Sequence, residues 1–359
     1  MGEAVRIGLV TSVGRTLDGF FPQIVSRLSS QGFVVTSASG SHSDLPDWTP
    51  LAGFTQRPSP ALVSAVRALR AWSRTHQHDV VVTNTATASA IVRLAGLSAP
   101  VVYFCHGLHW GRESDPRALP WRIVERGLLR RTAGVITINS DDQAWFERHH
   151  APHVHRLPGG VGVPLADFPR SAVPDAAELR LVWIGDFTPR KRPEQALAVV
   201  EHLVGAGVPV TLRMLGDGPL IDTVREQIRA RGLADVVRAD GRASAAAALA
   251  EASALLHTAT WEGLPRVALE AAAVGRWTYG FDVKGLRDAP LVRLAPDGDA
   301  AALARRIADD VAAGTVRSVP DVRDRLGVDA AADGIAAALL DVLGRPAPAS
   351  AGPVLPDAG

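Results

Sequence analysis

The chain has 359 residues, enough for about two domains of ordinary size. Hydrophobic residues make up 47% and charged residues 21%, a globular balance that argues against a disordered chain or a coiled coil. The formal net charge of +1 gives no global field that would select nucleic acid or an anionic membrane. The single cysteine, Cys105, excludes an internal disulfide and a cysteine-based zinc cluster.

Neither a membrane span nor a secretory signal is indicated. No apolar run approaches the ~18 residues that a span requires, and the first residues lack the basic and apolar regions of a signal peptide. We therefore expect a cytoplasmic protein, and we leave open a peripheral contact with the inner face of the membrane.

The first half alternates short β-branched runs with segments of helical period. Strands at 5–11 and 33–38 flank a helix at 20–28, and this βαβ order favours a parallel sheet covered by helices. The further predicted elements, in chain order, are helix 60–74, strand 79–83, helix 86–97, strand 100–105, helix 121–131, strand 134–138, helix 141–149 and strand 153–157.

Residues 158–180 are rich in Gly and Pro and have no period, which is typical of a linker. The alternation then begins again, with strand 181–184, helix 192–206, strand 210–215, helix 220–231, strand 236–238, helix 243–251, strand 254–258, helix 266–274, strand 277–281 and helices 300–313 and 330–343.

The predicted organisation is two α/β domains, each a doubly wound parallel sheet. The domains span 1–162 and 181–345, joined by a linker at 163–180 and followed by a flexible tail at 346–359. We leave open that the last helix packs back on the first domain. Ligands of such sheets bind outside the carboxyl ends of the strands, so two units suggest a cleft between them.

The segment 261–275, WEGLPRVALEAAAVG, carries two glutamates, Glu262 and Glu270. A Gly-Leu-Pro turn separates Glu262 from a helical pattern, and the first N–H groups of a helix suit an anion. Eight helical steps would place the carboxylates roughly 12 Å apart. A sugar nucleotide, with hydroxyls at both ends and phosphates in the middle, matches this layout. Taken alone, the pair is better explained as acids at a solvated helix start.

Two more loops are predicted at the same edge of the sheet. GDFTPRK at 185–191 places Arg190 and Lys191 after a strand, and LGDGPL at 215–220 has glycines that permit a close approach of backbone to a flat base or ribose. Lysine occurs only at 191 and 284, and arginine is the default base of this chain. We therefore favour a phosphate contact for Lys191 over a solvated surface charge.

These motifs, in this order and at these intervals, resemble the C-terminal domain of the retaining glycosyltransferases of family 4. The N-terminal half adds QRPSP at 56–60, TNTATASAIVRLAG at 83–96, FCHGLHW at 104–110 and ITINSDD at 136–142, while RLPGGVGV at 156–163 is similar to the inter-domain turn. Within the family, the combination is most similar to enzymes that assemble capsular polysaccharide, exopolysaccharide and polyprenyl-linked oligosaccharide.

The resemblance implies a GT-B fold, in which two Rossmann-like domains face each other across a cleft. The first domain would bind the acceptor and the second a nucleotide sugar, with Glu262 at the donor sugar as a catalytic residue and Glu270 at the ribose. The other implied donor contacts are Lys191, Arg190, Gly263, Leu264, Pro265 and Gly14 for the diphosphate, and Met214, Gly216, Asp217 and Gly218 for the base.

In the N-terminal domain, His106 matches the active-site histidine of the family and is preferred to His109. Arg57, His109 and Trp110 are candidate acceptor contacts. A second set, of arginines and tryptophans, has two possible roles. These residues would either meet a phosphorylated lipid at a membrane surface or form a solvated helix face. That set is Arg57, Arg112, Arg122, Arg126, Arg130 and Arg131, with Trp110 and Trp121.

One departure from the family pattern is Asp186, where the family usually has arginine. An acid near a diphosphate is repulsive. Three alternatives stay open: Asp186 turns away and Arg190 supplies the second cation, donor binding is weakened, or a positive group of the donor pairs with Asp186.

No metal-ligand cluster is visible in the sequence, and the histidines at 149, 150, 153 and 155 lie around a turn. We therefore expect no cofactor and no divalent metal, and charge on the leaving diphosphate would be balanced by Lys191, Arg190 and the helix start at Gly263.

The sequence thus predicts a retaining, metal-independent glycosyltransferase. It would move a hexose or N-acetylhexosamine from a UDP-sugar to a lipid-linked saccharide or polysaccharide precursor, without a nucleic-acid partner. The alternatives are a small natural-product acceptor such as an antibiotic aglycone, a UDP-sugar 2-epimerase of the same fold, and a non-catalytic glycosyltransferase-like auxiliary protein. The oligomeric state is left open.

Overall fold

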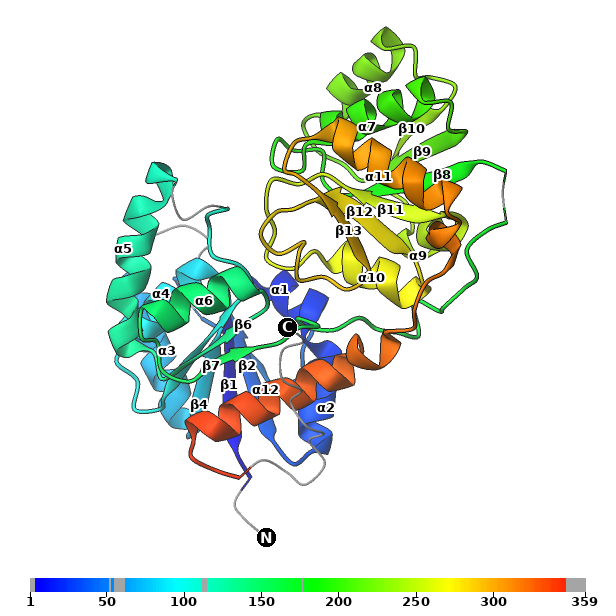
Figure 1. The fold of residues 1–359 in the computed structure, drawn as a ribbon. Helices are drawn as coiled ribbons and strands as arrows, with labels where there is room; N and C mark the ends of the chain where they lie inside the picture. The colour runs from blue at the N-terminus through cyan, green and yellow to red at the C-terminus, as the bar shows by residue number, and fades with distance from the viewer. Residues whose placement is uncertain (1–3, 52, 55–61, 112–114, 176, 347–359) are drawn as a thin grey trace. The chain divides into compact units, whose positions relative to one another are not determined.

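The computed structural model describes residues 4–51, 53–54, 62–111, 115–175 and 177–346. The chain divides into two compact units (Figure 1). Unit 1 comprises Met1–His109, Ser114–Gly162 and Val328–Gly359, and unit 2 comprises Trp110–Glu113 and Val163–Gly327. The predicted tail beyond residue 346 lies outside the described residues.

Unit 1 contains a parallel sheet in the order β3-β2-β1-β4-β5-β6-β7. The topology reverses between β1 and β4, where a doubly wound fold binds its ligand. The strands are β1 (Arg6–Thr11), β2 (Val34–Ser39), β3 (Trp48–Pro50), β4 (Val80–Thr83), β5 (Val101–Cys105), β6 (Gly134–Thr137) and β7 (Val154–Arg156). The helices are α1 (Gly14–Phe20), α2 (Pro22–Ser30), α3 (Leu62–Thr75), α4 (Ala86–Leu94), α5 (Leu119–Leu128), α6 (Ser140–Arg148) and α12 (Val328–Val342), with short 3₁₀ turns at Pro116–Ala118 and Leu129–Arg131.

Unit 2 contains a second parallel sheet in the order β10-β9-β8-β11-β12-β13, which reverses between β8 and β11. Its strands are β8 (Leu179–Ile184), β9 (Val210–Leu215), β10 (Val237–Gly241), β11 (Ala254–His257), β12 (Trp277–Phe281) and β13 (Val292–Ala295). Its helices are α7 (Pro193–Gly205), α8 (Ile221–Ala230), α9 (Ala245–Glu251), α10 (Arg266–Val274) and α11 (Ala300–Ala312), with 3₁₀ turns at Thr315–Arg317 and Arg323–Arg325.

The core of unit 1 follows from the alternation of side chains along a strand. On β1, Ile7 and Leu9 face a small apolar space that they share with α2 and α12. Val10 points the other way and belongs to the cluster formed with α3 and α4. Helices therefore cover both faces of the sheet, and the last helix of the chain covers one of them beside α2 (Figure 1).

Three elements of the structure were not predicted. The first is α1, whereas the helix predicted at 20–28 corresponds to α2, which begins at Pro22, a residue favoured in the first turn of a helix. β3 and β13 were not predicted, since their three and four residues show no apolar run that stands out from their surroundings. None of the helices in the described part of the chain is both long and apolar enough to span a bilayer.

The stretch after Gly162 was predicted as a linker, and its described part is held to unit 2 by the buried side chain of Arg276. The guanidinium of Arg276 donates to the carbonyl oxygens of Ser171, Ala172, Ala250 and Ala252 at 2.7–3.0 Å. Arg276 is fully buried, and burial lowers its pKa to about 10, so it stays charged at neutral pH. Its charge is thus compensated by backbone oxygens rather than by an acid.

Replacing Arg276 by methionine should therefore destabilise unit 2. The substitution leaves several buried carbonyl groups without a donor, and we expect the free energy of unfolding to fall by about 2–4 kcal/mol. Denaturant unfolding measures this, with Arg229→Met on the exposed side of α8 as the control. Equal stability of the two variants would contradict the proposed role.

Candidate functional site

Three loops of unit 2 meet at the carboxyl ends of its strands, on either side of the topological switch point. They follow β8, β9 and β11, the strands at and next to the reversal of the sheet. The hydroxyl of Thr258 donates to the carbonyl oxygens of Lys191 and Arg192, each at 2.9 Å, and the Thr260 N–H donates to the Arg190 carbonyl at 2.8 Å. The loop after β8 and the loop after β11 thus form one continuous surface.

Glycines let the loop after β9 lie against the loop after β8. Gly216 and Gly218 have φ values of +138° and +147°. A Cβ on Gly216 would lie 1.9 Å from the Gly185 carbonyl oxygen, and one on Gly218 would lie 2.7 Å from that of Phe187. These glycines were expected to admit a base or ribose, but the close approach that the structure shows is between two stretches of protein backbone.

The centre of the site is Glu262, a buried carboxylate between two cations. Its Oε1 lies 2.5 Å from Lys191 Nζ, and its Oε2 lies 2.9 Å from an Arg190 guanidinium nitrogen. Burial alone would raise the pKa of Glu262, but its contacts with His257, Lys191 and Arg190 outweigh burial and hold the pKa well below its ordinary value. Glu262 is therefore ionised, and the three side chains together carry a formal charge of +1.

His257, at the end of β11, is a site residue that the sequence reading missed. Its Nε2 lies 3.6 Å from Glu262 Oε1, and the residue is only 4% exposed. Burial lowers the pKa of His257, the nearby charges of Lys191 and Arg190 lower it further, and Glu262 opposes them. The ring is therefore neutral. In a sequence, a histidine at the end of a strand can equally well be a core residue or a site residue. Only its contact with Glu262 in the structure identifies His257 as part of the site.

Helix α10 begins directly after this cluster. Its N-cap residue, Pro265, provides no side-chain hydrogen bond to the first turn, so the positive end of the helix dipole is not satisfied by a cap. Because the helix begins at Arg266, only the second half of the interval between the two glutamates is helical. Gly263 and Leu264 form the turn between Glu262 and Pro265, where the resemblance places the diphosphate.

Glu270 lies one turn into α10 and is 9% exposed. Its Oε1 accepts a hydrogen bond from Arg266 Nε at 3.0 Å. Burial raises the pKa of Glu270, and the Arg266 charge only partly offsets this. A carboxylate that is costly to ionise in the free protein is suited to hydrogen-bond donors brought by a ligand.

Lys284, the second lysine of the chain, contacts the residues next to the Gly263–Leu264 turn. No role was predicted for it from the sequence. It is 4% exposed, and its Nζ donates to the Trp110 carbonyl at 2.9 Å. The ammonium lies 5.9 Å from the ring centroid of Trp110 and 5.8 Å from that of Trp261. Its backbone carbonyl accepts from the Glu262 N–H at 3.0 Å.

The remaining residues considered for the donor site have different surroundings. Asp217 and Asp186 are exposed, so water screens the charge of Asp186. Met214, expected at the base, has its side chain fully buried in the core of unit 2, which leaves its backbone as the part that could line a base. Gly14, expected at the diphosphate, lies in unit 1, and its N–H donates to Ser41 Oγ at 2.9 Å.

In unit 1, His106 follows β5 beside the switch point. Its Nε2 lies 2.8 Å from Asn84 Oδ1, and its ring stacks on Phe104 with centroids 4.2 Å apart. Burial lowers the pKa of His106 to about 4, so the ring is neutral at pH 7. The amide oxygen of Asn84 accepts from Nε2–H, which leaves Nδ1 as the acceptor nitrogen. Asn84 lies within a quoted motif, but no role was predicted for it.

The expected acceptor contacts are not equivalent in the structure. His109 is exposed, whereas Trp110 is 6% exposed and belongs to unit 2 through its contact with Lys284. Trp110 therefore does not present its ring to a membrane, which was one of the two alternatives. Arg57 and Arg112 lie outside the described residues.

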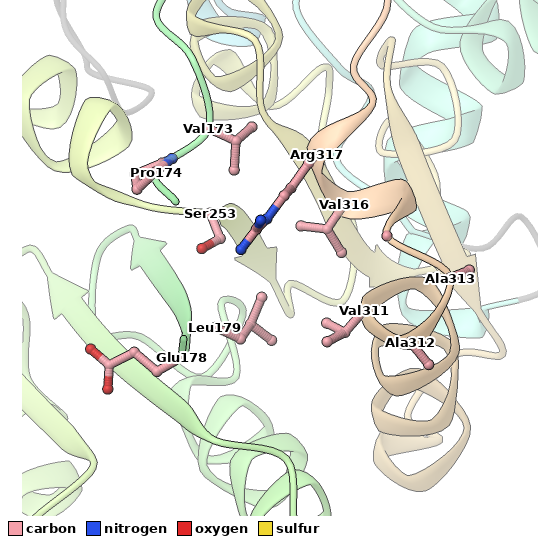
Figure 2. Close-up of a pocket in the computed structure, with 11 residues that line it drawn as sticks. Val173, Pro174, Glu178, Leu179, Ser253, Val311, Ala312, Ala313, Val316 and Arg317 are labelled. Carbon is pink, nitrogen blue, oxygen red and sulfur yellow. The ribbon is translucent and has the colours of Figure 1, made fainter. Parts of the chain in front are cut away.

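A pocket of about 340 Å³ in unit 2 is separate from these residues (Figure 2). Leu179 and Ser253 in its wall lie at the amino ends of β8 and β11, and Val311 comes from α11. This is the edge of the sheet opposite the three loops, and ligands of doubly wound sheets bind at the carboxyl edge. We therefore do not assign the pocket to the candidate site.

The environment of Glu270 leads to a prediction about stability. Because its pKa is raised in the folded protein, ionisation of Glu270 costs stability as the pH rises through that pKa. Glu270→Gln removes the charge and keeps an acceptor for Arg266. We expect the variant to gain thermal stability over the parent protein at pH 7 and to gain less at pH 4. A variant that is less stable at pH 7 would show instead that the ion pair with Arg266 dominates.

Comparison with known proteins agrees with this architecture. Residues 24–160 match the model of a glycosyl transferase 4-like domain, and residues 178–311 match that of glycosyl transferases group 1. The chain is 30% identical over 322 residues to 2-deoxystreptamine N-acetyl-D-glucosaminyltransferase of Streptomyces fradiae, an alignment that covers 78% of this chain and 75% of the relative.

Solved structures share the fold at lower identity. Sucrose-phosphate synthase from Thermosynechococcus elongatus is 18% identical, with a TM-score of 0.75 and coverage of 95% of this chain and 99% of that one. Anabaena HepE in complex with UDP and glucose is 17% identical, with a TM-score of 0.72 and coverage of 94% and 100%. The predicted fold class is confirmed: this chain is a GT-B glycosyltransferase and belongs to the glycosyl transferases group 1.

Proposed function

We propose that the protein transfers N-acetylglucosamine from UDP-N-acetylglucosamine to an aminocyclitol, with retention of anomeric configuration and without a divalent metal. The observation that carries the proposal is the arrangement around the start of α10. Two buried carboxylates, Glu262 and Glu270, flank an uncapped helix N-terminus, with Lys191 and Arg190 beside it. This arrangement matches a ligand with hydroxyls at both ends and an anion in the middle.

Different parts of the donor would contact different residues of this site, according to their charge. The diphosphate would lie at the turn of Gly263, Leu264 and Pro265, where it competes with Glu262 for Lys191 and Arg190. Glu270 would accept hydrogen bonds from the ribose hydroxyls, and the loop at Gly216–Gly218 would lie beside the base. Glu262, freed in part from its cations, would accept from the hydroxyls of the sugar.

Transfer breaks the bond between the anomeric carbon and the diphosphate oxygen and forms one to the acceptor oxygen. The acceptor proton leaves with the diphosphate, whose developing charge Lys191, Arg190 and the helix N-terminus would stabilise. We assign His106 to the reacting sugar, where its neutral ring, oriented by Asn84, accepts a hydrogen bond through Nδ1. Retention follows from the family resemblance.

The nature of the acceptor rests on the Streptomyces fradiae relative. Its name specifies transfer of N-acetyl-D-glucosamine to 2-deoxystreptamine, a small aminocyclitol. This favours the natural-product alternative over the lipid-linked acceptor that the sequence reading placed first.

A lipid-linked saccharide remains a second candidate because of one observation on α5. This helix exposes four large apolar side chains, Leu119, Trp121, Ile123 and Val124, and Arg126 is exposed beside them. Exposed apolar residues with arginines are typical of a helix that lies on an anionic membrane.

Binding of UDP without metal tests the donor site. In buffer containing a chelator, calorimetry should show one site per chain, because Lys191, Arg190 and the start of α10 supply the positive charge. Lys191→Met and Glu270→Gln should each weaken binding at least about 10-fold, since each removes a direct contact to a charged or multiply hydrogen-bonded group. Arg229→Met should bind as the parent does. UDP binding that appears only with Mg²⁺ or Mn²⁺ would contradict the proposal.

An acceptor panel tests the substrate class. With UDP-N-acetylglucosamine as donor, mass spectrometry should detect a disaccharide-like product with 2-deoxystreptamine and none with a polyprenyl-diphosphate saccharide in vesicles. Product with the lipid acceptor alone would favour the second candidate. Conversion of the donor sugar without any acceptor would indicate an epimerase.

A further inference from the structure

Three side chains with metal-ligating atoms converge on the outer edge of unit 1, away from the residues assigned above. They are His153, in the turn before β7, His155, in β7, and Asp341, from the last turn of α12. His153 Nδ1 lies 2.7 Å from Asp341 Oδ2, and His155 Nε2 lies 3.0 Å from the same oxygen. One ligand atom from each residue lies within 4.8 Å of the other two.

The backbone places these residues together independently of any ion. His153 directly precedes β7 and has a φ of +44°, and from this turn its ring meets the same Asp341 oxygen as the ring of His155 in β7. The Val135 N–H donates to the His153 carbonyl at 3.0 Å, which fixes β7 against β6. A Cβ on Gly134 would lie 2.5 Å from a methyl group of Val342 and 3.4 Å from the His153 Cβ. The missing side chain at Gly134 therefore brings the end of α12 close to β7.

The position of Asp341 favours a cation. A carboxylate in the last turn of a helix faces the negative end of the helix dipole, which is unfavourable unless a positive group lies nearby. The Asp341 carboxylate contacts both imidazoles through one oxygen.

We propose that His153, His155 and Asp341 bind a divalent transition metal of the zinc class. Zinc takes imidazole nitrogens and carboxylate oxygens at about 2.0–2.2 Å, so tetrahedral ligand atoms lie about 3.3 Å apart. The present N···O distances are shorter by about half an ångström, and these partly exposed side chains can open by that amount. Each imidazole would present an unprotonated nitrogen to the ion, with its proton on the other ring nitrogen, and water would complete the coordination.

Such an ion would join the edge strand of unit 1 to the helix that ends the fold. Among the residues that the structure describes, β7 is the edge strand of its sheet and pairs with β6, and α12 is held to unit 1 by its contacts with α2 and β6. A metal bridge between β7 and α12 would stabilise that attachment, because an ion that binds only the folded state raises its stability. The site is structural and separate from the metal-independent transfer proposed above, so its failure would leave the donor-site proposal unchanged.

The test is zinc binding by the full chain without a polyhistidine tag, after removal of metals with a chelator. Calorimetry should show one Zn²⁺ per chain with a Kd on the order of 1 µM or tighter, and no binding of Mg²⁺, which prefers oxygen ligands. His153→Asn and Asp341→Asn should each weaken zinc binding at least about 10-fold.

The chain offers a matched control in the same turn. His150 and His153 have φ values of +56° and +44°, and asparagine tolerates this conformation at both positions. His150→Asn should therefore bind zinc like the parent. Zinc at about 100-fold its Kd should raise the Tm of the parent and of His150→Asn by roughly 5 °C and leave that of His153→Asn unchanged.

Cobalt provides a readout that does not depend on any variant. Co²⁺ in the parent protein should show visible absorption typical of a four- or five-coordinate site, and Zn²⁺ should displace it. The absence of zinc binding up to 100 µM, or equal binding by His150→Asn and His153→Asn, would overturn the proposal.

Discussion

The contact of Glu262 with Lys191 and Arg190 is the interaction on which the rest of the donor site depends. It joins the loop after β8 to the loop after β11, 71 residues later, across the point where the sheet reverses. Without the two cations, burial would raise the pKa of Glu262, and a buried charge without partners would be strongly destabilising. With them, the free protein holds a compact, preorganised group of charges at the start of a helix.

This arrangement also explains how a site for an anion can be stable before the anion binds. Two cations brought together at a helix N-terminus would repel each other and the helix dipole. Glu262 compensates them in the free protein and leaves a net charge of +1. Glu270 has the opposite electrostatic situation, because its raised pKa reflects burial that Arg266 only partly compensates. Glu262 therefore stabilises the two cations in the free protein, whereas Glu270 can accept further hydrogen bonds from a ligand.

The sequence predicted the fold well because the fold depends on repeated local patterns. Alternating apolar runs and helical periods predicted most strands and helices of both sheets, and the GT-B class was implied by the family resemblance that the motifs carry. Short elements such as Trp48–Pro50 carry too few residues for a pattern, and their pairing is decided by neighbours distant in the sequence. Helix α1, at Gly14–Phe20, was missed because its seven residues include two glycines and few apolar side chains.

The site was predicted less completely, since the sequence shows which residues follow a strand but not what they contact. Glu262, Lys191 and Arg190 come together as adjacent loops suggested. Met214 is in the core because alternate residues of β9 point inward, and Trp110 is buried and accepts a hydrogen bond from a lysine 174 residues away. His257 and Asn84 became visible only through their contacts with Glu262 and His106.

A structure of the protein with UDP-N-acetylglucosamine, obtained in the presence of a chelator, tests the central claim most directly. We expect the diphosphate at the start of α10 within hydrogen-bond distance of Lys191, the ribose hydroxyls on Glu270, and Glu262 turned towards the sugar. A nucleotide bound at another edge of unit 2, with the pairs Lys191–Glu262 and Arg266–Glu270 unchanged, would contradict this account.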